Sequence, residues 1–142
     1  MIKRKGSAVW SGGLKDGKGT VSTQSGVLNQ QQYGFNTRFE DGAGTNPEEL
    51  IAAAHAGCFT MALSGQLGAQ GLTATSLRTN AIVSLDKVEG GFSINAIHLE
   101  LVAAIPGATQ EQFDTATNNA KENCPVSKLL NAQITLDAKL ES

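Results

Sequence analysis

The chain has 142 residues, of which 40% are hydrophobic, 17% charged and 5% aromatic, and its formal net charge at pH 7 is −2. This size predicts one domain spanning residues 1–142, and the weak acidity, without a basic run that carries aromatic residues, argues against a nucleic-acid partner. No run of 18 apolar residues and no secretion-signal pattern occur, so we expect a soluble, cytoplasmic protein with no membrane partner.

Short segments rich in Val, Thr and aromatic residues, separated by glycines, occupy residues 7–39 and predict a small sheet of short strands. A helix is expected to start at Pro47, with Thr45 and Asn46 as candidate caps and Glu49 in a capping-box position, and to end near Gly71.

This helix lacks a polar face, because nearly every residue between positions 50 and 63 is apolar. We therefore expect it to be buried on all sides. A subunit of this size would enclose such a helix only with difficulty, and its run of Ala and Gly suits close helix packing, so a homodimer is predicted.

The second half of the chain alternates as strands do over residues 77–85 and again over residues 92–103, where a change of phase predicts a bulge near Ala96. Residues 109–122 are expected to be helical, a short helix is expected to open at Cys124 and Pro125, and residues 134–140 form a closing strand. This order of elements predicts an α+β fold.

The two cysteines, Cys58 and Cys124, are far apart in the sequence and lack the spacing of a zinc site. Cys58 falls in the middle of the apolar helix, where burial would raise its pKa and leave it inert as a small core residue. Cys124 would lie at a helix N-cap, where the helix dipole favours the thiolate, although an ordinary capping role is the alternative.

Three further residues are candidates for chemistry. Arg38 lies between two phenylalanines and is either a solvated strand residue or a buried cation that needs a carboxylate, for which Glu48 is the candidate partner. Glu48 is otherwise a surface acid that complements the helix dipole. His55, three residues before Cys58, is either a core residue or the base of a Cys/His pair.

Five segments resemble the OsmC family in order and spacing: Gly19–Asn29, Tyr33–Glu40, Gly44–Leu50, Ala54–Phe59 and Asn123–Ser127. The segments around Pro47 and Cys58 are shared with the organic hydroperoxide resistance (Ohr) branch, whereas Asn36–Glu40 resembles the osmotically inducible OsmC branch more closely. The Ohr branch carries an active-site arginine in an early loop, but Ser11–Lys18 contains none, so Arg38 takes that role.

The resemblance implies an intertwined α+β homodimer with a buried central helix packed against sheets and with active sites at the subunit boundary. It implies a thiol-dependent peroxidase in which Cys58 is the peroxidatic thiol, Cys124 is the resolving thiol, and Arg38 with Glu48 activates Cys58. The implied substrates are organic hydroperoxides, with hydrogen peroxide used less efficiently, and the implied reductant is a lipoyl-type dithiol. The chemistry needs no metal, flavin or haem cofactor.

Helix geometry adds one expectation about this site. Ten residues of α-helix separate Glu48 from Cys58 by about 15 Å along the axis, so we expect the two residues of one site to come from different subunits. Two alternatives stay open: an acyl-transfer hydrolase that uses Cys58 and His55, and a non-enzymatic stress protein whose thiols are inert.

Overall fold

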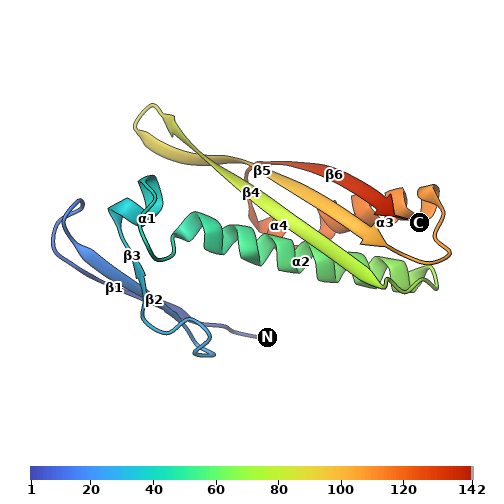
Figure 1. Ribbon diagram of the computed structural model, residues 1–142, viewed down its shortest axis with the longest axis horizontal. Coiled ribbons are helices and arrows are strands. Elements are labelled where there is room, and N and C mark those ends of the chain that lie inside the picture. The colour runs from blue at the N-terminus through green and yellow to red at the C-terminus, as the bar shows by residue number, and fades with distance from the viewer. Residues whose placement is uncertain (142) are drawn as a thin grey trace. The chain divides into compact units, whose positions relative to one another are not determined.

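A computed structural model describes residues 1–141, which form two compact units: residues 1–50, and the chain from Ile51 onward. Each unit contains its own three-stranded sheet, and helices accompany both (Figure 1). The predicted α+β class is confirmed. The boundary falls inside the long helix α2 (Pro47–Ala69), so this helix belongs to both units.

The first unit is an antiparallel meander of β1 (Gly6–Ser11), β2 (Lys18–Thr23) and β3 (Gln31–Tyr33), followed by the short helix α1 (Phe35–Phe39). The expectation of strands through residue 39 is wrong for α1. Gly34 N–H donates to the Thr37 hydroxyl, and that hydroxyl donates to the Gly34 carbonyl. These local bonds satisfy the backbone within one turn and replace strand pairing, so Arg38 lies on a helix.

Helix α2 begins as predicted. Asn46 Oδ1 accepts from Glu49 N–H at 2.8 Å, and Asn46 Nδ2 donates to the Glu49 carboxylate at 2.9 Å and to the Thr37 carbonyl at 3.0 Å. Asn46 therefore caps α2 and also ties its start to α1. Glu49 takes the capping role, which leaves the Glu48 carboxylate available for another partner.

The second unit contains the sheet β4 (Ser76–Val88), β5 (Gly91–Ala104) and β6 (Gln133–Glu141), with β5 in the centre. Strands β4 and β5 form a long antiparallel hairpin, and β6 lies parallel to β5 (Figure 1). The pairing shifts from Ser84 opposite Ala96 to Leu85 opposite Ile94, so Asn95 is the extra residue of a bulge. The predicted bulge near Ala96 is confirmed.

One face of this sheet carries the core. The buried β5 residues share one parity, and α2 with α3 (Gln110–Asn123) covers that face, while α4 (Pro125–Leu129) follows α3 directly. The core side chains come mainly from α2, β5 and α3. They are Phe59, Leu63 and Leu67 on α2, Ile97, Leu99, Leu101 and Ala103 on β5, and Phe113, Ala116 and Ala120 on α3. Cys124, the N-cap of α4, belongs to the same core cluster, so the start of α4 packs in one layer with α2.

Within one chain, α2 is not buried on all sides. Residues spaced four apart, from His55 through Leu67, form a buried ridge, whereas Gly57, Met61 and Ser64 on another side are exposed. Met61 is 79% exposed. By length and composition α2 is also apolar enough to cross a membrane, but the core helix of a soluble protein passes the same test, and the ridge packs into the second unit.

The cap at Asn46 yields a stability prediction. Asn46→Ala should lower the free energy of unfolding by about 1–2 kcal/mol, because the Glu49 amide loses its acceptor and the tie to α1 is lost. Asn46→Ser is the matched control: it keeps a capping oxygen and should retain most of the stability. Guanidinium denaturation measures both, and equal midpoints for Asn46→Ala and the wild type would show that the cap contributes nothing.

Candidate active site

The two cysteines, distant in sequence, lie together in the second unit. Both are free thiols, and the Cys58 thiol hydrogen-bonds to the sulfur of Cys124. Cys58 is half-buried in the middle of α2, whereas Cys124 is completely buried at the N-cap of α4. The predicted capping position of Cys124 is confirmed, and Cys58 is the more accessible of the two residues.

The first turn of α4 donates a backbone N–H group to each sulfur. Pro125 has no N–H and occupies the first helical position; the amide of Val126 donates to Cys58. The amide of Ser127 donates to Cys124 Sγ at 3.3 Å. N–H groups at the start of a helix have no partner within the helix, so here they are available to donate hydrogen bonds to sulfur.

The environment of Cys58 nevertheless disfavours its thiolate. Burial raises the pKa of the Cys58 thiol, and this is the largest effect; the Val126 amide lowers it, and the neighbouring Cys124 raises it again through a hydrogen bond and charge repulsion. The thiolate is the nucleophilic form of cysteine. The second unit therefore brings the two sulfurs together in surroundings that favour the thiol form of Cys58 over the thiolate.

His55 is fully buried and contacts Ser127, and no hydrogen bond joins it to Cys58 among residues 1–141. Its Nε2 lies 2.7 Å from Ser127 Oγ, and the same hydroxyl lies 3.1 Å from Cys124 Sγ. Burial lowers the pKa of His55, so the imidazole is neutral near pH 7. The sequence analysis did not identify Ser127 or Val126 as residues of the site. Ser127 could have been found from its position three residues after the capping Cys124, where its backbone N–H bonds to the cap.

Arg38 and Glu48 form an ion pair in the first unit, as the sequence suggested. Arg38 Nε donates to Glu48 Oε1 at 2.6 Å, and the guanidinium stacks over the Phe39 ring at 5.3 Å. The Glu48 side chain is 10% exposed and that of Arg38 40% exposed. Buried Glu48 Oε2 has no further hydrogen-bond partner among the described residues. The carboxylate holds one edge of the guanidinium and leaves the rest of it accessible.

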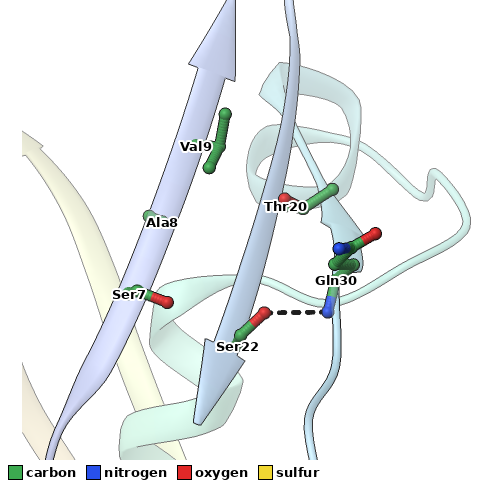
Figure 2. Close-up of a pocket in the computed structure, with 6 residues that line it drawn as sticks. All are labelled: Ser7, Ala8, Val9, Thr20, Ser22 and Gln30. Atoms are coloured by element: carbon green, nitrogen blue, oxygen red, sulfur yellow. Dashed lines mark hydrogen bonds between the residues drawn. The ribbon is translucent and has the colours of Figure 1, made fainter.

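Two pockets on the first unit are lined by none of the candidate site residues. One of about 400 Å³ is lined by six residues in and beside the meander. Figure 2 shows the backbone N–H of Gln30 donating to Ser22 Oγ there. A second, of about 550 Å³, lies around Lys15 and Tyr33. Among residues 1–141 no group of three or more His, Cys, Asp or Glu side chains is placed to hold a metal ion.

Comparison with known proteins places this arrangement in a family. The model of the OsmC family, described as OsmC-like protein, matches residues 40–139. The chain is 60% identical over 141 residues to peroxiredoxin OsmC of Escherichia coli K12, covering 99% of each chain. It is 32% identical over 124 residues to the organic hydroperoxide resistance protein OhrB of Bacillus subtilis, covering 87% of this chain and 88% of that protein. The crystal structure of OhrB superposes with a TM-score of 0.69 at 28% identity, covering 99% of this chain and 98% of that one.

Neutral His55 predicts a loss of stability in acid. Its pKa in the folded chain lies below the ordinary value of 6.5, so as the pH falls below 6.5 the unfolded chain binds a proton that the folded chain does not. The free energy of unfolding should therefore decline through this range, and His55→Gln should decline less steeply. Denaturation at several pH values measures the slopes, and parallel curves for wild type and His55→Gln would contradict the assignment.

Proposed function

The chain belongs to the OsmC family, and we propose that it is a thiol-dependent peroxidase that reduces organic hydroperoxides, and hydrogen peroxide less efficiently, with Cys58 as the peroxidatic and Cys124 as the resolving thiol. The observation that carries these roles is the contact between two free thiols, of which Cys58 is partly accessible and Cys124 is completely buried. A peroxide reaches the accessible sulfur first, and the buried one is already in place to resolve it.

The reaction follows from thiol chemistry. The Cys58 thiolate attacks one oxygen of the peroxide, the O–O bond breaks, and an alcohol leaves while Cys58 becomes a sulfenic acid. Cys124 then displaces hydroxide from that sulfur, which gives the Cys58–Cys124 disulfide and water. A dithiol reductant, which we propose to be of the lipoyl type, restores both thiols by exchange.

Arg38 and Glu48 are proposed as the activating pair. The raised pKa of Cys58 in the second unit calls for a cation, and a guanidinium beside the sulfur would favour the thiolate and stabilise the departing alkoxide. The 2.6 Å bond from Arg38 to Glu48 fixes one edge of the guanidinium and balances its charge. The Phe39 ring under the guanidinium adds an apolar surface suited to an alkyl substrate.

We further propose that the active form is an intertwined homodimer in which Arg38 and Glu48 of one subunit serve Cys58 of the other. Glu48 and Cys58 are ten residues apart on α2, about 15 Å along its axis, which is too far for a carboxylate at the helix start to act on the thiol of its own chain. The exposed strip of α2, with Gly57 and Met61, is small and apolar enough to pack against its two-fold mate.

The two compact units are proposed to work as one domain, because the family match crosses their boundary at residue 50 and continues to residue 139. We propose a cytoplasmic location, because the cytosol keeps cysteines reduced and the proposed reaction starts from two reduced thiols. The competing hydrolase hypothesis is disfavoured, because it needs His55 as the base for Cys58 and His55 bonds to Ser127 instead.

The roles of the thiols are tested by single substitutions. Cys58→Ser should abolish turnover of cumene hydroperoxide, because no nucleophile remains. Cys124→Ser should consume about one peroxide per Cys58 and form no intramolecular disulfide, because the sulfenic acid lacks its resolving thiol. Stopped-flow kinetics and mass spectrometry of the products distinguish the two, and full turnover by Cys58→Ser would refute the assignment.

Mixing inactive variants tests whether each site draws on two chains. Glu48→Ala and Cys58→Ser subunits, denatured together and refolded, should recover activity in about a quarter of the sites, since one site of each heterodimer is intact in a two-fold assembly. Cys58→Ser mixed with Cys124→Ser is the control and should recover none, because both cysteines of a site lie in one chain. Heterodimers without activity in the first mixture would place Glu48 in its own chain or outside the site.

A further inference from the structure

A hydrogen-bonded chain runs inward from the site and ends at a buried base. Cys124 Sγ lies 3.1 Å from Ser127 Oγ, and Ser127 Oγ lies 2.7 Å from His55 Nε2. Cys124 and His55 are completely buried, and Ser127 is 8% exposed. The proposed peroxidase reaction uses neither Ser127 nor His55, yet both are buried polar groups whose hydrogen bonds lead to a reacting sulfur.

Only one proton arrangement makes this chain reactive. In this arrangement the neutral imidazole carries its proton on Nδ1, which has no hydrogen-bond partner among the described residues, and its Nε2 accepts a hydrogen bond from the Ser127 hydroxyl. The Ser127 oxygen is then free to accept a hydrogen bond from the Cys124 thiol. The proton on sulfur then points along the chain toward His55. The other neutral tautomer would donate from Nε2 and turn the hydroxyl proton toward Cys124, where it could only stabilise a thiolate that had already formed.

We propose that Ser127 and His55 form a proton relay that deprotonates Cys124 as it resolves the oxidised Cys58, an inference that rests on the proposed function. The Cys124 sulfur forms the S–S bond with Cys58 while the bond from Cys58 to its hydroxyl oxygen breaks. The thiol proton passes to Ser127 Oγ as the Ser127 hydroxyl proton passes to His55 Nε2. The hydroxide leaves as water with a proton from solvent, and His55 later returns its proton to solvent.

The surroundings explain why a relay is needed at this sulfur. Cys124 has no exposed surface, so solvent hydroxide reaches its proton only when the site opens, whereas Cys58 is partly accessible. The amide of Ser127 donates to Cys124 Sγ at 3.3 Å and stabilises the thiolate that the relay creates. Ser127 touches the reacting sulfur and is the catalytic member; His55 acts through Ser127 and is a positioning residue.

Few other ionisable groups bear on the relay. Cys58 and Cys124 are the ionisable groups beside it, and Cys58 is consumed as the sulfenic acid before the relay acts. The remaining ionisable side chains of β4, β5, α3 and α4 are half-buried or exposed, among them His98 and Glu100 on β5, Lys121 and Glu122 on α3, and Lys128 on α4. Within this unit, the pH dependence of the resolving step therefore reports on His55 and the Cys124 thiol.

The experiment separates the two chemical steps in one turnover. The full-length reduced protein is mixed with one equivalent of cumene hydroperoxide; stopped-flow follows oxidation of Cys58, and trapping of the sulfenic acid by a 1,3-dione with mass spectrometry follows its conversion to disulfide. The variants are Ser127→Ala, Ser127→Thr and His55→Gln. Thr117→Val is the matched control, because it removes another buried hydroxyl of the same unit.

Ser127→Ala and His55→Gln should slow disulfide formation about 10²-fold, the lower end of the effect of general base catalysis, and far more than they alter oxidation of Cys58. Ser127→Thr keeps the hydroxyl and should restore most of the rate, and Thr117→Val should match the wild type. In His55→Gln the disulfide rate should rise about tenfold per pH unit between pH 6 and 8, because deprotonation then depends on hydroxide, whereas the wild-type rate should rise less steeply.

The outcomes are distinct. Disulfide formation at the wild-type rate in both Ser127→Ala and His55→Gln would overturn the relay and leave the peroxidase assignment intact. A wild-type protein whose Cys58 is not oxidised would overturn both. Should Ser127→Ala fail to fold, His55→Gln breaks the chain from its other end with Ser127 in place, and a normal rate and pH profile in that variant would by itself refute the relay.

Discussion

The start of α4 is the constraint on which the thiol site depends. Cys124 caps this helix, Pro125 occupies the position whose N–H would be superfluous, and the next two amides donate to the sulfurs of Cys58 and Cys124. Serine or aspartate usually occupies this capping position and accepts a hydrogen bond from the first turn through a side-chain oxygen. Here the sulfur of Cys124 accepts that hydrogen bond instead. The same turn thus ends α3, opens α4 and fixes the spacing of two groups that react with each other.

Burial of Cys58 raises the pKa of its thiol and so disfavours the reactive thiolate, and the fold offsets this effect only in part. Packing beside Phe59 and the sheet raises the pKa of the thiol, and the single Val126 amide offsets part of that effect. The described residues of the second unit place no cation against the sulfur. The ion pair proposed to activate Cys58, Arg38 with Glu48, belongs to the first unit. The chain therefore divides the proposed chemistry between a unit that holds the sulfurs and a unit that holds the charge.

Local patterns predicted most of the fold. Alternation predicted the β4–β5 hairpin and a bulge near Ala96, which the structure places at Asn95, and the capping residues before Pro47 predicted the start of α2. The pairing of Arg38 with Glu48 was expected only if Arg38 were buried, because an isolated buried guanidinium is costly; the pair forms although the Arg38 side chain is 40% exposed. Helix α1 was missed because its turn depends on the Thr37 hydroxyl, which a strand pattern conceals, and the His55–Ser127 contact was missed because residues on different helices meet only through tertiary packing.

The location of Cys58 on α2 links assembly to chemistry in the proposed enzyme. It lies between the buried ridge that includes His55 and the exposed strip that includes Met61. Any surface that covers the strip also removes water from the edge where Cys58 lies, and by desolvation alone it would raise the thiol pKa further. A purely apolar partner would therefore make Cys58 less reactive. Only a partner that brings a positive charge with its apolar surface both protects the helix and activates the thiol, and a second copy of this chain carries that combination in the Arg38–Glu48 pair.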